Sequence, residues 1–124
     1  MTVYVTPDAV DAIVRDAGFT YRDRGLMLSA LGAPMPVFGN EVYPSLHEKA
    51  AVLMLAVNRS HPLLDGNKRT SWYLVTFFYA ENGYVLQPGN PLEADTFIRF
   101  VAAGRVKLGA LASWLAARAQ AAAR

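Results

Sequence analysis

The sequence predicts an all-α protein, and two observations carry this prediction. Apolar residues recur three or four positions apart in six segments, most of which begin at a capping residue and end at glycine or before proline. Alternation typical of strands is scarce and is confined to residues 3–5, 35–38 and 84–86. The expected helices cover about residues 7–17, 23–31, 46–60, 67–82 and 92–103, with a last one that carries Leu108, Leu111, Trp114 and Leu115.

The first two helices are defined by their ends. Thr6 is the expected N-cap of the first helix, Pro7 takes the first helical position, and Gly18 closes the helix. The second helix is expected to run from about Asp23 to a stop at Gly32.

The next stretch, residues 33–44, contains three prolines and a glycine and is expected to be a loop or a short hairpin. Ser45 and Glu48 then form a capping box for the third helix, which ends before Pro62. His47 is expected on the exposed, solvated side of this helix. The apolar face predicted for it comprises Leu46, Ala50, Leu53, Met54 and Val57.

The second half of the chain is expected to hold three more helices. The inner face predicted for the helix that ends at Asn82 and Gly83 comprises Trp72, Val75, Thr76 and Tyr79. A turn-rich link over residues 87–91 precedes the fifth helix, and Gly104 ends that helix. The alanine-rich stretch 116–124 is interpreted as a helix that frays into a tail.

Length and composition limit what the protein can be. The chain has 124 residues, which fits one domain spanning 1–124, and 53% of them are hydrophobic, enough to bury a core. The absence of cysteine excludes disulfides, thiolate metal sites and cysteine nucleophiles. With no signal peptide and no membrane-spanning stretch in the sequence, a cytoplasmic location is expected. The net charge of +2 suits a small anionic ligand and gives little support to nucleic-acid binding.

One loop concentrates the chemistry of the chain. Between two apolar helices stands the run HPLLDGNKR, from His61 to Arg69, which holds an imidazole, a carboxylate, a glycine and two cations. The two cations fall at a helix start, where they oppose the helix dipole. A bound anion would explain them, since free backbone N–H groups at such an end bind anions.

Familiar alternatives fail on spacing. The phosphate-binding P-loop needs a glycine before its lysine, but Asn67 precedes Lys68 here. A zinc site built on paired histidines is excluded, because His47 and His61 are the only histidines.

The run resembles the signature of the Fic/Doc superfamily, and specifically its Doc (death-on-curing) toxin branch. The residues that match are His61, Asp65, Gly66, Asn67, Lys68 and Arg69, in that order. Leu63 stands where the family has phenylalanine, which is a tolerable swap at a core position. The resemblance implies a single-domain helical bundle of the Fic/Doc type, in which residues 33–44 would be a small hairpin flap that docks the target.

Two positions separate the Doc branch from the AMP-transferring Fic proteins. Lys68 replaces a glycine of the AMP-transferase motif, and Trp72 stands in place of its final arginine. The resemblance to Doc implies a kinase: the γ-phosphate of ATP passes to a threonine of elongation factor Tu, and translation stops. We expect Trp72 itself to be a core residue.

The resemblance also implies residue roles, each chemically reasonable. His61 would be the general base that takes the proton of the attacking hydroxyl. Asp65 would bind Mg²⁺, a hard cation that prefers oxygen ligands. Gly66 and Asn67 would donate hydrogen bonds to phosphate oxygens, and Lys68 and Arg69 would stabilise the remaining charge.

Partners and alternatives complete the expectation. The resemblance implies a Phd-type antitoxin that lies across the toxin groove, with no nucleic acid and no membrane as partner. A second reading is transfer of AMP or another nucleotide to a protein hydroxyl. A third is a non-catalytic binding module that retains the loop, or a toxin that grips the ribosome or RNA.

Overall fold

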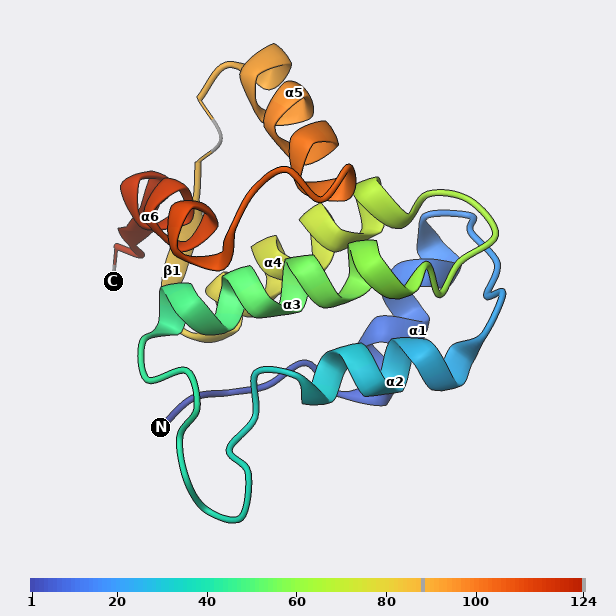
Figure 1. Ribbon diagram of the computed structural model, residues 1–124, viewed down its shortest axis with the longest axis horizontal. Coiled ribbons are helices and arrows are strands. Elements are labelled where there is room, and N and C mark those ends of the chain that lie inside the picture. The colour runs from blue at the N-terminus through green and yellow to red at the C-terminus, as the bar shows by residue number, and fades with distance from the viewer. Residues whose placement is uncertain (88, 124) are drawn as a thin grey trace.

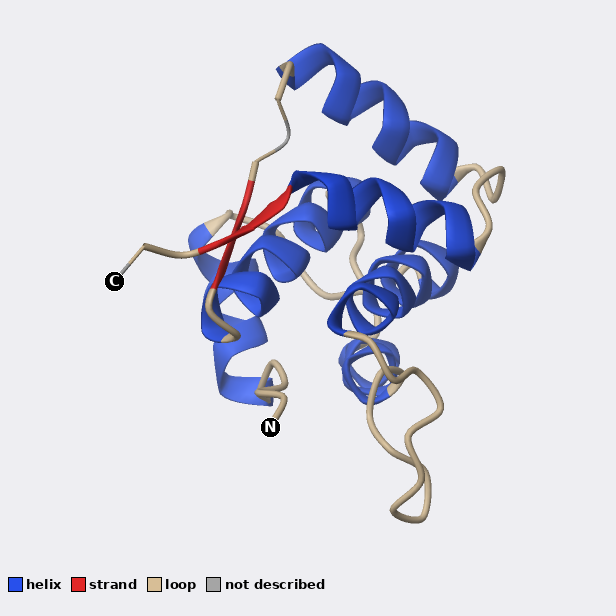
Figure 2. Cartoon of the chain, turned by 90° about the vertical axis from the view of Figure 1, so that its left-hand side faces the viewer, coloured by secondary structure: helices blue, strands red, loops and turns tan. Residues whose placement is uncertain are grey.

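The computed structural model describes residues 1–87 and 89–123, and it confirms the all-α prediction. Within these residues the chain forms six helices and one two-stranded antiparallel sheet (Figures 1 and 2). The elements are α1 (Pro7–Asp16), α2 (Arg24–Gly32), α3 (Leu46–Ser60), α4 (Asn67–Glu81), β1 (Tyr84–Leu86), α5 (Pro91–Ala102), α6 (Leu108–Arg118) and β2 (Ala119–Ala121). No helix of the described chain is long and apolar enough to cross a membrane.

The predicted N-caps Thr6 and Ser45 start α1 and α3, and Asp23, the expected start of the second helix, is the N-cap of α2. The Thr6 hydroxyl accepts a hydrogen bond from the backbone of Ala9, and the Asp23 carboxylate accepts one from Leu26, each at 3.2 Å. Ser45 likewise accepts from the backbone N–H of Glu48 at 3.0 Å. These bonds satisfy donors that the helix itself leaves free, which explains why the helices begin where the sequence predicts.

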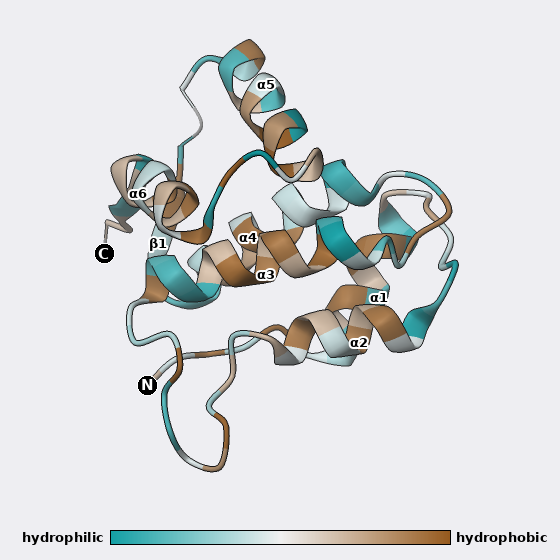
Figure 3. Cartoon of the chain, in the orientation of Figure 1, coloured by the Kyte–Doolittle hydropathy of each residue, from teal (hydrophilic) through white to brown (hydrophobic). Residues whose placement is uncertain are grey.

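Helix α3 forms the centre of the molecule. It packs against α2, α4, α5 and α6, and it lies across the middle of the view in Figure 1. Its predicted apolar face is confirmed, because Ala50, Leu53, Met54 and Val57 are buried and Leu46 is half-buried. Figure 3 shows that hydrophobic residues recur along α3. The loop that follows α3 is therefore attached to the most deeply packed helix of the fold.

The inner face predicted for α4 is rotated. Val75 and Tyr79 are buried as expected, but Trp72 and Thr76 are only half-buried. The positions that are buried as well are Thr70, Ser71, Leu74 and Phe78. Helix α4 contacts α1, α3, α5 and β1, so the stripe of residues that it buries is wider than one amphipathic face.

The C-terminal tail was predicted wrongly as a fraying helix. Helix α6 stops at Arg118, and Ala119–Ala121 pair with Tyr84–Leu86 as antiparallel strands. The backbone N–H of Gln87 continues this pairing to the carbonyl of Arg118 at 2.8 Å. Backbone hydrogen bonds hold this strand, and alanine has no side-chain signal that predicts them. Within the predicted link 87–91, Pro88 lies outside the described residues, as does Arg124 of the tail.

Residues 33–44 form a loop rather than a two-stranded hairpin. A single bridge joins Val37 to Asn40 around a tight turn in which Phe38 and Gly39 both have positive φ. The loop is held at its base by Lys49, which is 1% exposed and donates to a Glu41 carboxylate oxygen at 2.7 Å. Lys49 also donates to the carbonyl of Tyr43. Residues 3–5 and 35–38, which showed weak alternation, form no strand in the described chain.

The solvated position predicted for His47 was wrong. His47 is half-buried, and its Nδ1 lies 2.8 Å from the hydroxyl of Tyr79. Its ring also packs near the edge of Tyr84. Burial raises the pKa of Tyr79, so this phenol stays protonated and can hydrogen-bond to the imidazole. His47 belongs to an aromatic cluster of the fold.

Candidate active site

The loop that contains the motif is fastened to the core by its own residues. Leu63 is 1% exposed and enters the hydrophobic core, as predicted for this position. The Asn67 side chain makes two hydrogen bonds with the backbone of Leu63: its Oδ1 accepts from the N–H at 2.9 Å, and its Nδ2 donates to the carbonyl at 3.1 Å. The side-chain amide of Asn67 therefore uses two hydrogen bonds to hold the backbone of the loop, and one Nδ2 hydrogen remains available to a ligand.

A second segment, residues 19–23 between α1 and α2, supports the loop from outside. Arg22 donates from Nε to the carbonyl of His61 and from Nη2 to that of Ser60, both at 2.8 Å. The backbone N–H groups of Arg22 and Asp23 bind the carbonyl of Pro62. These contacts leave the loop few ways to move, and nothing in the motif itself predicts them.

Gly66 is required by both its conformation and its surroundings. Its φ of +83° lies in the left-handed region, which L side chains rarely adopt. A Cβ atom placed on it would lie only 2.4 Å from Cζ of Phe19. The aromatic ring of Phe19 thus covers the glycine directly, and no other residue fits without displacing that ring.

The first turn of α4 has the character of an anion site. Gly66 is the N-cap residue and provides no side-chain cap to the first backbone N–H groups. Lys68 and Arg69 follow at once and are both exposed. Free N–H groups, the positive end of the helix dipole and two cations therefore coincide.

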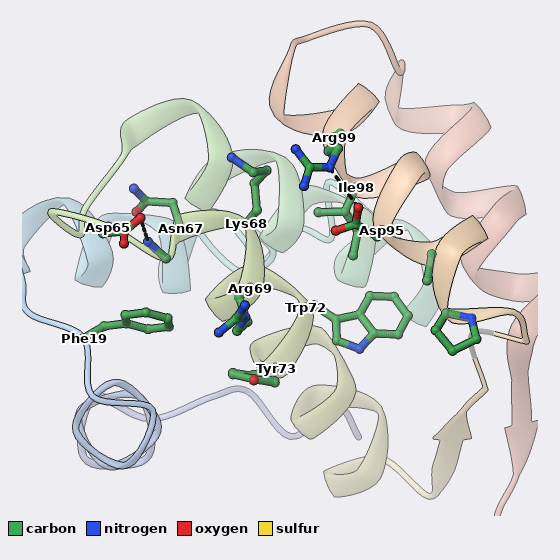
Figure 4. A pocket seen from close by; sticks show the side chains of 13 residues that line it. Phe19, Asp65, Asn67, Lys68, Arg69, Trp72, Tyr73, Asp95, Ile98 and Arg99 are labelled. Atoms are coloured by element: carbon green, nitrogen blue, oxygen red, sulfur yellow. Dashed lines mark hydrogen bonds and ion pairs between the residues drawn. The ribbon is translucent and has the colours of Figure 1, made fainter.

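These residues line one cavity of about 470 Å³, a size typical of small-molecule sites. Its walls come from the start of α4 and from α5, with Phe19 at one side (Figure 4). In that view Asp65 and Asn67 lie at one end and Trp72 toward the other. The lining comprises Phe19, Asp65, Gly66, Asn67, Lys68, Arg69, Trp72, Tyr73, Pro91, Ala94, Asp95, Ile98 and Arg99. Five of the six predicted site residues are therefore brought together.

His61, the sixth, stands apart from this lining. It caps the C-terminal end of α3 in the left-handed conformation, with φ of +49°, and its side chain is exposed. The position follows from Pro62, which ends the helix, and from Arg22, which fixes the His61 carbonyl. The imidazole is thus presented to solvent at the outer end of the same loop.

Asp65 is the carboxylate of the motif that lines the cavity. It is exposed, and its Oδ1 accepts a hydrogen bond from the backbone N–H of Gly66 at 2.8 Å. In the described residues no group of three or more carboxylate or imidazole side chains could hold a metal unaided. Mg²⁺ is commonly held by one or two carboxylates together with substrate phosphates, so the carboxylate of Asp65 beside the cationic start of α4 fits this ion.

Several lining residues escaped the sequence analysis, among them Phe19, Asp95 and Arg99. Phe19 lies in the connection after α1 and carries no motif. Asp95 and Arg99 are four residues apart on α5, a spacing that predicts an ion pair but not its location at a cavity. Trp72, expected in the core, is half-buried: it meets Trp114 edge to face at 6.2 Å and also borders the cavity.

Comparison with known proteins places this site in a family. The model of the Fic/DOC family matches residues 6–79, which include the whole motif loop and most of α4. The chain therefore belongs to the Fic/DOC family. Among individual proteins, it is 38% identical over 103 residues to Toxin Doc of Mycolicibacterium smegmatis, and the alignment covers 82% of this chain and 79% of that protein.

Proposed function

We propose that this protein is the toxin of a toxin–antitoxin module and acts as a Mg²⁺-dependent protein kinase of the Doc type. Membership of the Fic/DOC family and the similarity to Toxin Doc support a toxin that transfers a group to a protein. The single observation that favours nucleotide chemistry is the cavity in which Asp65, Lys68 and Arg69 meet at the start of α4. A carboxylate for Mg²⁺ beside two cations suits a phosphate chain and few other ligands.

In the proposed reaction a threonine hydroxyl attacks the γ-phosphorus of ATP. A bond forms between the hydroxyl oxygen and phosphorus, the bond from phosphorus to the β,γ-bridging oxygen breaks, and ADP leaves. His61 accepts the hydroxyl proton. Its exposed imidazole suits this role, because the hydroxyl arrives on a whole protein and must reach the base from solvent.

The remaining motif residues act on the nucleotide. Lys68 and Arg69 hold the phosphate oxygens and stabilise the charge as it redistributes, assisted by the first N–H groups of α4. The remaining Nδ2 hydrogen of Asn67 is a further donor for phosphate. Mg²⁺, when bound by Asp65 and the phosphates, neutralises charge on the nucleotide.

The target and partner of this proposal come from the resemblance to the Doc branch. The target is a threonine of an elongation factor Tu-like protein, whose phosphorylation arrests translation in the cytoplasm. The partner is a Phd-type antitoxin that covers the toxin groove. For target docking this proposal assigns the loop 33–44, where the side chains of Val37, Phe38 and Val42 are exposed.

The test uses the purified protein with Mg²⁺, elongation factor Tu and ATP labelled on either the γ- or the α-phosphate. Label from the γ position alone supports the kinase, and label from the α position would replace it with AMP transfer. His61→Ala should abolish labelling, whereas His47→Gln, which alters the other histidine and keeps a hydrogen-bonding side chain, should retain it. If neither label reaches the factor or any protein of a cell lysate, the proposed activity is wrong.

A further inference from the structure

Helix α5 carries an ion pair at the edge of the cavity, outside the residues that the family model matches. Nε of Arg99 donates to Oδ2 of Asp95 at 2.8 Å, and both side chains line the cavity across from the motif residues of α4 (Figure 4). Among the described residues that line the cavity, Arg99 is the one cation that does not come from α4.

The packing of α5 fixes this face toward the cavity. Ala94, Ile98 and Val101 are buried against the rest of the protein. On another side of the helix, Phe97 stacks on Trp114 with ring centroids 4.3 Å apart and ring planes 4° from parallel. With these contacts made, Asp95 and Arg99 stand at the cavity edge beside Ala94 and Ile98.

The guanidinium of Arg99 is available to a ligand. Asp95 engages only Nε, and no hydrogen bond in the described structure uses the two terminal nitrogens of Arg99. The hydrogen bond that Arg99 donates to Asp95 raises the pKa of Arg99, so the group stays charged. The side chains are 67% and 61% exposed, and a pair so exposed contributes little to stability, so turning Arg99 toward a ligand costs little.

Charge balance favours an anion at this place. The lining includes three cations and two carboxylates, and one of the carboxylates, Asp65, is the proposed Mg²⁺ ligand. A nucleoside triphosphate carries more negative charge than Lys68 and Arg69 neutralise. A planar guanidinium with two free nitrogens suits phosphate oxygens, which it binds in bidentate fashion.

We propose that Arg99 binds the phosphate chain of the nucleotide, as a cation that α5 supplies from the wall opposite the motif. This inference rests on the proposed function for the nature of the ligand. It adds a binding residue outside the motif, and it makes α5 part of the nucleotide site. The plain alternative is that Asp95 and Arg99 merely stabilise the exposed side of α5.

The experiment measures binding of ATP with Mg²⁺, and of adenosine, by NMR titration of the full chain. Arg99→Met should weaken ATP binding about tenfold and leave adenosine binding within twofold, because only ATP carries the phosphates that Arg99 contacts. The ATP affinity of Arg99→Lys should lie between those of the parent and Arg99→Met, since lysine keeps the charge but loses the bidentate guanidinium. Arg105→Met removes an exposed cation, six residues after Arg99 in the chain, that does not line the cavity, and this variant should bind ATP like the parent. The salt dependence of ATP binding should weaken in Arg99→Met alone.

Three outcomes would overturn the inference: ATP binding unchanged in Arg99→Met, an equal loss for adenosine, or a parent protein that binds no ATP. An equal loss for adenosine would point to the structural role of the pair. The proposed kinase activity is tested separately, by the labelling experiment. If the parent binds ATP and Arg99→Met weakens that binding, but no protein becomes labelled, the activity is wrong and the role of Arg99 is retained.

Discussion

Gly66→Ala tests how the motif loop is held, and its cost can be worked out from two separate contributions. The left-handed backbone at φ of +83° costs an alanine about 1–2 kcal/mol. The new methyl group would meet three atoms of the Phe19 ring at 2.4–2.5 Å, and relieving such overpacking costs about 1–3 kcal/mol. The free energy of unfolding should therefore fall by about 2–5 kcal/mol.

A double-mutant cycle separates the two contributions. Urea unfolding, followed by tryptophan fluorescence and circular dichroism, would be measured for Gly66→Ala, Phe19→Ala and the double variant. With the ring removed, Gly66→Ala should cost only its backbone share of about 1–2 kcal/mol. Gly18→Ala is the matched control, because Gly18 also has positive φ but its Cβ would meet no atom within 4 Å. An equal cost of Gly66→Ala with and without Phe19 would refute the argument that the ring closes over the glycine.

Two further predictions concern groups away from the cavity. Lys49→Met should lower the free energy of unfolding by about 1–2 kcal/mol, because half-exposed Glu41 can hydrate once its partner is gone. Glu41→Ala should cost more, about 3 kcal/mol, because it strands a buried ammonium; urea unfolding of both variants checks the order, and the reverse order would contradict it. The Arg24 guanidinium holds the pKa of Asp11 below its usual range, so the contribution of this pair is present at neutral pH and is lost as the pH falls from about 4 through the folded value. Asp11→Asn should therefore reduce the acid dependence of stability, as measured by urea midpoints between about pH 2 and 6; an unchanged slope would argue against the pair.

Local signals in the sequence predicted most of the helical fold. Caps such as Thr6 and Ser45 act through bonds three residues away, so they can be read from the chain alone. The strand Ala119–Ala121 was missed because its partner lies more than thirty residues earlier and its alanines carry no pattern. His47 was misplaced for the same reason: the tyrosines that surround it belong to later elements.

The candidate site shows the same division between local and distant signals. The residues from Asp65 to Arg69 are consecutive, so the motif alone predicted that they act together. Phe19 reaches the same cavity from the connection after α1 and Arg99 from α5, and only the fold brings them there. Asn67 was predicted as a phosphate donor, and its grip on the backbone of Leu63 is visible only in three dimensions.

The pairing of β1 with β2 has a consequence for how this protein can change. The two strands lie before α5 and after α6 in the chain, and their pairing brings the two ends of this segment together just after α4 (Figure 2). One wall of the cavity thus comes from α4, which packs against the central helix α3, and another comes from α5, which belongs to the segment between the two strands. On the proposed role of Arg99, substitutions on α5 should alter ligand binding while the motif loop keeps the hydrogen bonds that anchor it to Arg22 and Asn67.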